Sequence, residues 1–125
     1  MSEESRKVNI GSRKYTEIIR VDEPGEGGAC HCYAVHTVPD KDGLSMGNCA
    51  HVNFQNGPVK KAGVNGCHQE DLIAIVIDRL QHFQRGEYSC RENAIALTKL
   101  EEAMHWLNHR TAGRVVRGVE GTDKK

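Results

Sequence analysis

The chain has 125 residues with 17 basic and 17 acidic side chains, so its formal net charge is zero. This balance argues against nonspecific binding to nucleic-acid polymers, which needs a basic surplus. No apolar run reaches the length of a membrane span, and the polar start of the chain lacks an apolar signal-peptide region, so the cytosol is the expected compartment. The length fits one domain, residues 1–125, with residues 1–66 mainly β and residues 67–121 a helical hairpin.

The first half of the chain is expected to form an antiparallel sheet. Three segments have strand character: residues 15–21, 29–38 and 49–55. In the third, Ala50, Val52 and Phe54 alternate with polar side chains, as in a strand with one buried face. Turn-forming compositions lie between these segments, at residues 25–28 and 39–43. Asn56-Gly57 is a two-residue hairpin signal, so residues 59–64 are expected to form a return strand opened by Pro58.

The second half is expected to form two helices that fold back as an antiparallel hairpin, which makes the fold class α+β. The first helix covers residues 70–84 and is apolar over much of its circumference, because Ala74 and Ile75 lie beside its main stripe. Such a helix is covered on more than one side, which predicts an oligomer. The second helix is expected to begin at Ser89, whose spacing to Glu92 is that of a capping box. Residues after Glu120 are expected to fray.

The short link between the helices places Phe83 and Asn93 at the same end of the predicted hairpin. An aromatic face can stack on a nucleobase, and an amide can both donate to and accept from a base edge. The alternative interpretation is structural: Phe83 would cover the end of the core and Asn93 would be an ordinary helix-start residue.

Three arginines, Arg110, Arg114 and Arg117, lie on one stripe near the end of the second predicted helix. Guanidinium groups bind phosphates through paired hydrogen bonds, so the stripe is a candidate anion site. A solvated helix end, where cations favour the helix dipole, is the alternative. Seventeen residues separate Asn93 from Arg110, or about 25 Å of helix, so the two candidate sites would be distinct within one subunit.

Cysteine and histidine residues suggest two further hypotheses, a metal site and a Cys–His hydrolase. The chain has five cysteines, an odd number without an export signal, so they are expected to be reduced thiols. The segment Cys30-His31-Cys32 has the wrong spacing for a zinc knuckle, so no metal is expected there. Cys67 is the candidate nucleophile because it precedes a predicted helix, and Cys90 is the other. Neither has a convincing orienting acid.

Five segments of the second half resemble a known family. They are residues 52–58 (VNFQNGP), 63–66 (GVNG), 70–76 (EDLIAIV), 90–103 (CRENAIALTKLEEA) and 117–121 (RGVEG). Together they look like the phage Thoeris anti-defence sponge family, the first such family described. The helical hairpin is also similar to that of the phage anti-CBASS cyclic-dinucleotide sponges. The resemblance covers about residues 50–121.

The resemblance implies a non-catalytic protein that binds nucleotide immune signals in the host bacterial cytoplasm and holds them without cleavage or cofactor. The implied ligand is glycocyclic ADP-ribose from TIR-domain enzymes, and some members bind cyclic di- or trinucleotides at a second site. By resemblance, Phe83 and Asn93 match the cyclic ADP-ribose pocket, and Arg110 and Arg114 match the basic pair for cyclic oligonucleotides. The resemblance also implies a homodimer, since proteins of this family form dimers that can assemble into hexamers. The alternative from the residues alone is a small nucleic-acid-binding or structural phage protein.

Overall fold

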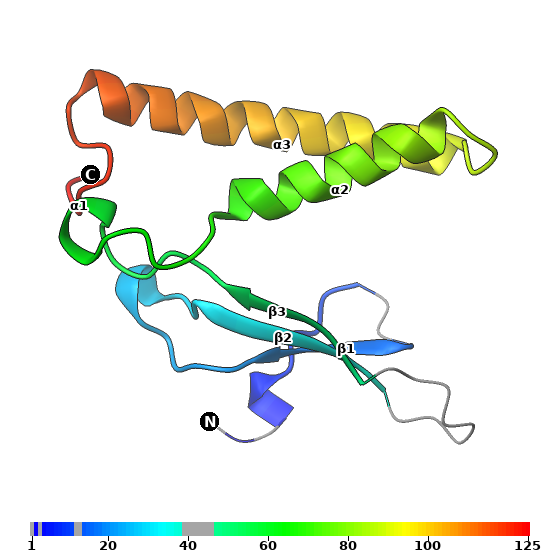
Figure 1. Ribbon diagram of the computed structural model, residues 1–125, viewed down its shortest axis with the longest axis horizontal. Helices are drawn as coiled ribbons and strands as arrows, with labels where there is room; N and C mark the ends of the chain where they lie inside the picture. Colours follow the sequence, from blue (N-terminus) through cyan, green and yellow to red (C-terminus); the bar gives the residue numbers. More distant parts are fainter. Residues whose placement is uncertain (1, 3, 12–13, 39–46) are drawn as a thin grey trace. The chain divides into compact units, whose positions relative to one another are not determined.

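The computed structural model describes residues 2, 4–11, 14–38 and 47–125. The chain divides into two compact units, Met1–Gly57 with Ala62–Cys67, and Pro58–Lys61 with His68–Lys125. The first unit contains an antiparallel sheet and the second contains two long helices (Figure 1). The predicted α+β class is therefore confirmed. The turn expected at residues 39–43 lies outside the described residues.

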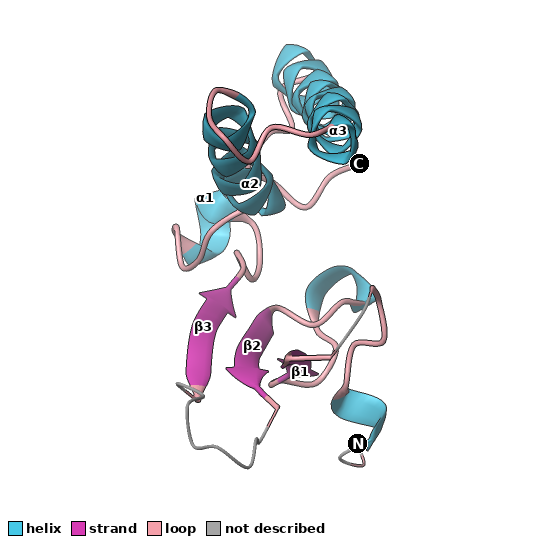
Figure 2. Ribbon diagram, turned by 90° about the vertical axis from the view of Figure 1, so that its right-hand side faces the viewer, coloured by secondary structure: helices cyan, strands magenta, loops and turns pink. Residues whose placement is uncertain are grey.

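The sheet has three strands, β1 (Thr16–Arg20), β2 (Cys32–Thr37) and β3 (Asn48–Asn53), in the order β1-β2-β3 (Figure 2). The strands pair antiparallel, with Thr16 opposite Thr37 and Cys32 opposite Asn53. The register between β2 and β3 slips beyond Val35, where a bulge bends the ladder. All three strand predictions are confirmed, with boundaries that differ by one to three residues.

The alternation seen in the third strand segment produces a half-buried face. Val52 lies opposite Tyr33, and the rings of Tyr33 and Phe54 meet edge to face with centroids 5.7 Å apart. Val52 and Phe54 are half-buried, whereas Ala50 is exposed. Among the described residues the one buried hydrophobic side chain is Cys30, which is 8% exposed. The apolar core of this unit is thus small.

Backbone and arginine hydrogen bonds hold the N-terminal segment, which includes the 3-10 turn η1 (Glu4–Arg6), against the edge strand β1. Val8 donates its N–H to the carbonyl of Ile18 at 3.0 Å, and the guanidinium of Arg20 donates to the carbonyls of Ser5 and Lys7 at 3.0 Å each. This segment covers part of an edge that would otherwise expose unpaired backbone groups. A second 3-10 turn, η2 (Glu26–Gly28), forms in the predicted glycine-rich turn.

The predicted hairpin at Asn56-Gly57 and the return strand at residues 59–64 are wrong. A type I′ turn needs positive φ at both central residues, but only Gly57 has it, with φ of 88°. Side-chain amides capture the backbone instead: Gln55 donates to the carbonyls of Gly57 and Gly63, and the Asn65 amide accepts from the Asn56 N–H and donates to the Asn56 carbonyl. The loop is closed by these bonds, and within it lies a short helix, α1 (Val59–Ala62).

Two antiparallel helices, α2 (Gln69–Gln84) and α3 (Arg91–Val116), lie side by side as predicted (Figures 1 and 2). Along α3 the apolar side chains at steps of three and four residues are half-buried: Leu97, Leu100, Met104 and Leu107. The helices contain no fully buried side chain. Several large apolar side chains remain exposed, namely Ile75, Val76, Ile95, Trp106, Val115 and Val116. These exposed groups agree with the reason for expecting an oligomer, and the oligomer stays a prediction.

The predicted start of the second long helix and the expected fraying of the C-terminal segment both need correction. The N-cap of α3 is Cys90, not Ser89. The Cys90 sulfur accepts a hydrogen bond from the Asn93 N–H, in place of the expected capping box between Ser89 and Glu92. Beyond α3 the chain is tied back: Lys60 donates its N–H to the carbonyl of Gly121 at 3.0 Å. No helix in the described ranges is long and apolar enough to cross a membrane.

Candidate functional site

The turn between α2 and α3 is closed by a pair of hydrogen bonds from one side chain. The amide of Gln84, the last residue of α2, accepts from the Cys90 N–H at 3.0 Å and donates to the Cys90 carbonyl at 3.1 Å. Cys90 is thereby held in an extended conformation, with φ of −155° and ψ of 163°. A residue in this extended conformation cannot be part of a helix. The helix α3 therefore begins at Arg91, and Cys90 is its N-cap.

Asn93 lies in the first turn of α3, where the cap fixes its backbone. Its N–H donates to the Cys90 sulfur, and its side-chain amide donates to the carbonyl of Tyr88, both at 3.4 Å. The side-chain oxygen of Asn93 accepts no hydrogen bond from any described residue, and the side chain is half-buried. An amide held by its NH₂ group with a vacant carbonyl oxygen is suited to accept from a donor on a ligand.

Phe83 lies one residue before the end of α2, at the same end of the hairpin as Asn93. Its ring meets the ring of Tyr88 edge to face, with centroids 5.7 Å apart and planes at 87°. The Arg79 guanidinium carbon lies 4.9 Å from the centroid of the Phe83 ring. The structure therefore places both predicted pocket residues at the α2–α3 turn, together with a cation and a second aromatic ring.

Sequence reasoning missed three residues that lie at this turn: Arg79, Gln84 and Tyr88. For Arg79 a signal was present, because a residue four positions before an aromatic on a helix lies on the same face. For Tyr88 and Gln84 no such signal exists, since turn residues have no fixed periodicity.

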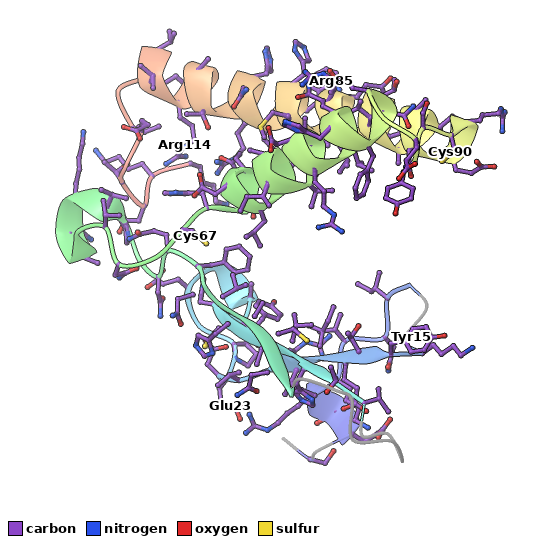
Figure 3. All side chains as sticks on the ribbon, turned by 45° about the vertical axis from the view of Figure 1, so that its right-hand side comes forward. Tyr15, Glu23, Cys67, Arg85, Cys90 and Arg114 are labelled. Atoms are coloured by element: carbon purple, nitrogen blue, oxygen red, sulfur yellow. The ribbon has the colours of Figure 1, made fainter. Side chains whose placement is uncertain are left out.

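The arginines near the C-terminal end of α3, of which Figure 3 labels Arg114, differ in how far backbone carbonyls engage them. The Arg114 guanidinium donates to the carbonyls of Lys124, Val119 and Thr122, at 2.7, 3.0 and 3.0 Å. Arg117 donates to the carbonyls of Gly113 and Lys125 at 3.4 and 3.1 Å. Arg110 is exposed. Three of the five N–H groups of Arg114 are thus engaged with the C-terminal segment, whereas Arg110 projects into solvent.

The cysteine and histidine hypotheses fall on the sheet unit and the loop that follows it. Cys67 precedes the helix but does not cap it, because His68 is the N-cap of α2 and Cys67 bridges to Phe54 instead. The Cys32 sulfur lies 3.4 Å from Nε2 of His51 across the β2–β3 pair. Within the part of the chain that the structure describes, no three metal-ligating side chains gather.

The segment around Cys30 is organised by one carboxylate. Asp22 accepts hydrogen bonds from the N–H groups of His31 and Cys32, and the His31 N–H lowers the pKa of Asp22 most. Cys30 donates its thiol to the Asp22 carbonyl at 3.4 Å, and burial raises the pKa of that thiol. A thiol with a raised pKa is less often the reactive thiolate, which argues against Cys30 as a nucleophile.

Two comparisons with known proteins find similarity, to a family and to one phage protein. The family described as "Acb2/Tad1, hairpin domain" matches residues 49–112, just over half of the chain. A protein of Bacillus phage SBSphiJ7 called "Thoeris anti-defense 1" is 65% identical over 79 residues, which cover 63% of this chain and 56% of that protein. The chain therefore spans little more than half the length of this curated relative. The matched region includes Phe83, Asn93 and Arg110 and ends before Arg114.

Proposed function

Since the chain belongs to the Acb2/Tad1 hairpin-domain family, we propose that it is a phage anti-defence protein that sequesters nucleotide second messengers of bacterial immunity. The proposed ligand is glycocyclic ADP-ribose from TIR-domain enzymes, held without cleavage in the host bacterial cytoplasm. One observation carries the proposal: Phe83 and Asn93 lie together at the α2–α3 turn within the matched hairpin, and Asn93 keeps a vacant carbonyl oxygen.

The chemistry of that turn fits a purine nucleotide. An aromatic ring provides a stacking surface for adenine, and an anchored amide reads a base or ribose edge. Neither group is a nucleophile or a general base, which agrees with binding rather than turnover. The zero formal net charge keeps the protein from binding bulk nucleic acid while local cations remain at the site.

We also propose that Arg110, with Arg114, serves cyclic di- or trinucleotides at a second site near the end of α3. Arg110 is the freer of the two, because three carbonyls already accept from Arg114. In a homodimer or homohexamer, several copies of Arg110 would meet one polyanionic ligand, so the second site depends on assembly. Light scattering tests this directly: an oligomer is expected, and a monomer at micromolar concentration would contradict it.

Calorimetric titration with glycocyclic ADP-ribose tests the main proposal. Binding by the wild type is expected, with strong weakening in Phe83→Ala and in Asn93→Ala. Lys99→Ala is a matched control on α3, since Lys99 is exposed and pairs only weakly with Glu102. Ligand recovered after heat denaturation should be intact. A degraded product would instead indicate an enzyme, and absence of wild-type binding would rule the proposal out.

A small nucleic-acid-binding or structural phage protein is the competing function. It predicts a DNA or RNA complex that is weakened by salt and by Arg110→Ala/Arg114→Ala. The balanced charge of the chain argues against it.

A further inference from the structure

The aromatic face proposed for base stacking already has an occupant. The Arg79 guanidinium lies over the Phe83 ring, with its carbon 4.9 Å from the ring centroid. The two residues are four positions apart on α2, so the helix itself brings them together. Phe83 is half-buried, but Arg79 is exposed. A cation whose other side faces water is attracted to a ring only weakly, so the contact is readily exchanged.

The charge of Arg79 is not neutralised by a neighbouring carboxylate. Asp78, the adjacent acidic residue, lies within 3.7 Å of His82 instead. No carboxylate of the described residues lies within ion-pair distance of Arg79, and the residue is exposed. Arg79 is therefore a cation that is held by a ring alone and is available for an anion.

Tyr88 borders the same ring and is linked to the predicted pocket amide. Its ring meets Phe83 edge to face, and its backbone carbonyl accepts from the Asn93 side chain. Tyr88 is 66% exposed, so a ligand can reach it from solvent. Cation, stacking ring, bordering ring and amide thus occur in one cluster at the α2–α3 turn.

We infer that Arg79 is a binding residue of this site: it covers Phe83 in the free protein and transfers to a ligand phosphate when a base takes its place. The inference rests on the proposed function and adds the residue by which the turn would select a phosphate-bearing nucleotide over its nucleoside. Bases stack on aromatic side chains in a sequence-tolerant way, so an adenine can replace the guanidinium over Phe83. The displaced guanidinium, still attached one helical turn away, is a planar donor suited to a phosphate.

The exchange gives a specific energetic signature. A nucleoside displaces Arg79 and gains stacking, but offers the guanidinium no anion. A nucleotide gains both stacking and charge-assisted hydrogen bonds, which are the stronger kind. Loss of Arg79 should therefore weaken a nucleotide and leave a nucleoside unchanged or slightly tighter.

The test compares glycocyclic ADP-ribose with adenosine on the full chain, using wild type, Arg79→Gln, Arg79→Lys and Arg85→Gln. Arg85 is the matched control, an exposed arginine at the C-cap of α2 (Figure 3). Arg79→Gln should weaken glycocyclic ADP-ribose roughly ten- to a hundredfold and reduce the salt dependence of its binding, while adenosine affinity does not fall. Arg79→Lys should restore part of the loss, and Arg85→Gln should resemble the wild type.

Nuclear magnetic resonance gives a second readout that does not depend on affinity. The side-chain protons of Arg79 should show an upfield ring-current shift in the free protein, which disappears in Phe83→Ala and on addition of glycocyclic ADP-ribose. Equal weakening of nucleotide and nucleoside by Arg79→Gln would make Arg79 a packing residue only and would overturn the inference. Unchanged nucleotide binding by Arg79→Gln would also overturn it while leaving the proposed function intact; failure of the wild type to bind would overturn both.

Discussion

The two ends of the α2–α3 hairpin hold amide and arginine side chains whose hydrogen-bonding groups are used to different extents. At the α2–α3 turn, Asn93 has a vacant carbonyl oxygen and Arg79 contacts only a ring. At the other end, the Arg114 fork is engaged by three backbone carbonyls of the C-terminal segment. A polar group that is already satisfied stabilises its own fold, whereas one that is held but unsatisfied is prepared for a ligand. The turn is therefore the stronger ligand site of the two.

Removing the side chains of Phe83 and Asn93 at the α2–α3 turn should cause the largest loss of ligand affinity. The double variant Phe83→Ala/Asn93→Ala should weaken glycocyclic ADP-ribose by about a hundredfold or more, because it loses both a stacking surface and a hydrogen-bonding amide. Calorimetry measures the loss, and circular dichroism verifies that the hairpin remains helical. Arg110→Ala is the comparison at the other end and should leave this ligand bound. If both variants bind equally well, the two ends do not differ in the proposed way.

At the C-terminal end of α3, the larger effect should be on stability. Arg114→Gln removes donors to three carbonyls, so the free energy of unfolding should fall by about 1–3 kcal/mol. Arg110→Gln, a neighbouring exposed arginine, should change it by about 0.5 kcal/mol or less. Urea denaturation of the two variants measures both changes. Equal destabilisation would mean that the carbonyl contacts of Arg114 contribute nothing.

Gln84 connects stability to the site at the turn. Gln84→Ala loses both hydrogen bonds to Cys90, which should lower the free energy of unfolding by about 1–2 kcal/mol. Because the same bonds set the start of α3, the affinity for glycocyclic ADP-ribose should also fall several-fold. Gln84→Glu keeps the acceptor for the Cys90 N–H and should retain part of both properties. An unchanged melting temperature in Gln84→Ala would show that the turn does not need this side chain.

The sequence correctly predicted the strands and helices in which apolar residues recur at a regular spacing. Alternation in the third strand and helical spacing around Leu97 and Leu107 correspond to a strand and a helix of the structure. The short link between helices also brought Phe83 and Asn93 to one end, since chain connectivity leaves few alternatives.

Local competition among polar groups explains the errors. Asn56-Gly57 is a hairpin signal in isolation, but the side-chain amides of Gln55 and Asn65 bind backbone groups of the loop and hold it in another conformation. Serine is a more common N-cap than cysteine, so Ser89 is the expected start of the helix. The hydrogen bond between the Gln84 side chain and the Cys90 backbone holds Cys90 extended, and Cys90 becomes the N-cap instead. Such contacts join residues at spacings that no period describes, so the pattern of the sequence does not report them.

The same limit applies to the arginine stripe. Spacing placed Arg110, Arg114 and Arg117 on one face, but it could not reveal that the C-terminal segment returns to two of them. A stripe of cations in a sequence therefore reports position on a helix and not availability to a ligand.

The smallest expected effect concerns the pH dependence of the C-terminal segment. Asp123 accepts from the Lys61 ammonium at 2.8 Å, and that hydrogen bond lowers the pKa of the Asp123 carboxyl below its ordinary value of 3.8. A carboxyl with a lowered pKa in the folded state binds protons more readily when unfolded. Its stabilising contribution is therefore complete above pH 3.8 and is lost as the pH falls through the lowered value.

Hydrogen exchange can follow this loss at the Lys60 N–H, which donates to the Gly121 carbonyl beside the ion pair. Protection of that amide should decline as the pH falls below the ordinary pKa, and Asp123→Asn should remove the part of the decline that Lys61 causes. The effect should be small, because both side chains are more than half exposed and solvent screens their attraction. The Asn93 N–H, which donates to the Cys90 sulfur, should show no such dependence on Asp123. A parallel loss of protection at both amides would mean that the whole hairpin opens with acid, and the two ends of α3 would then not be independent.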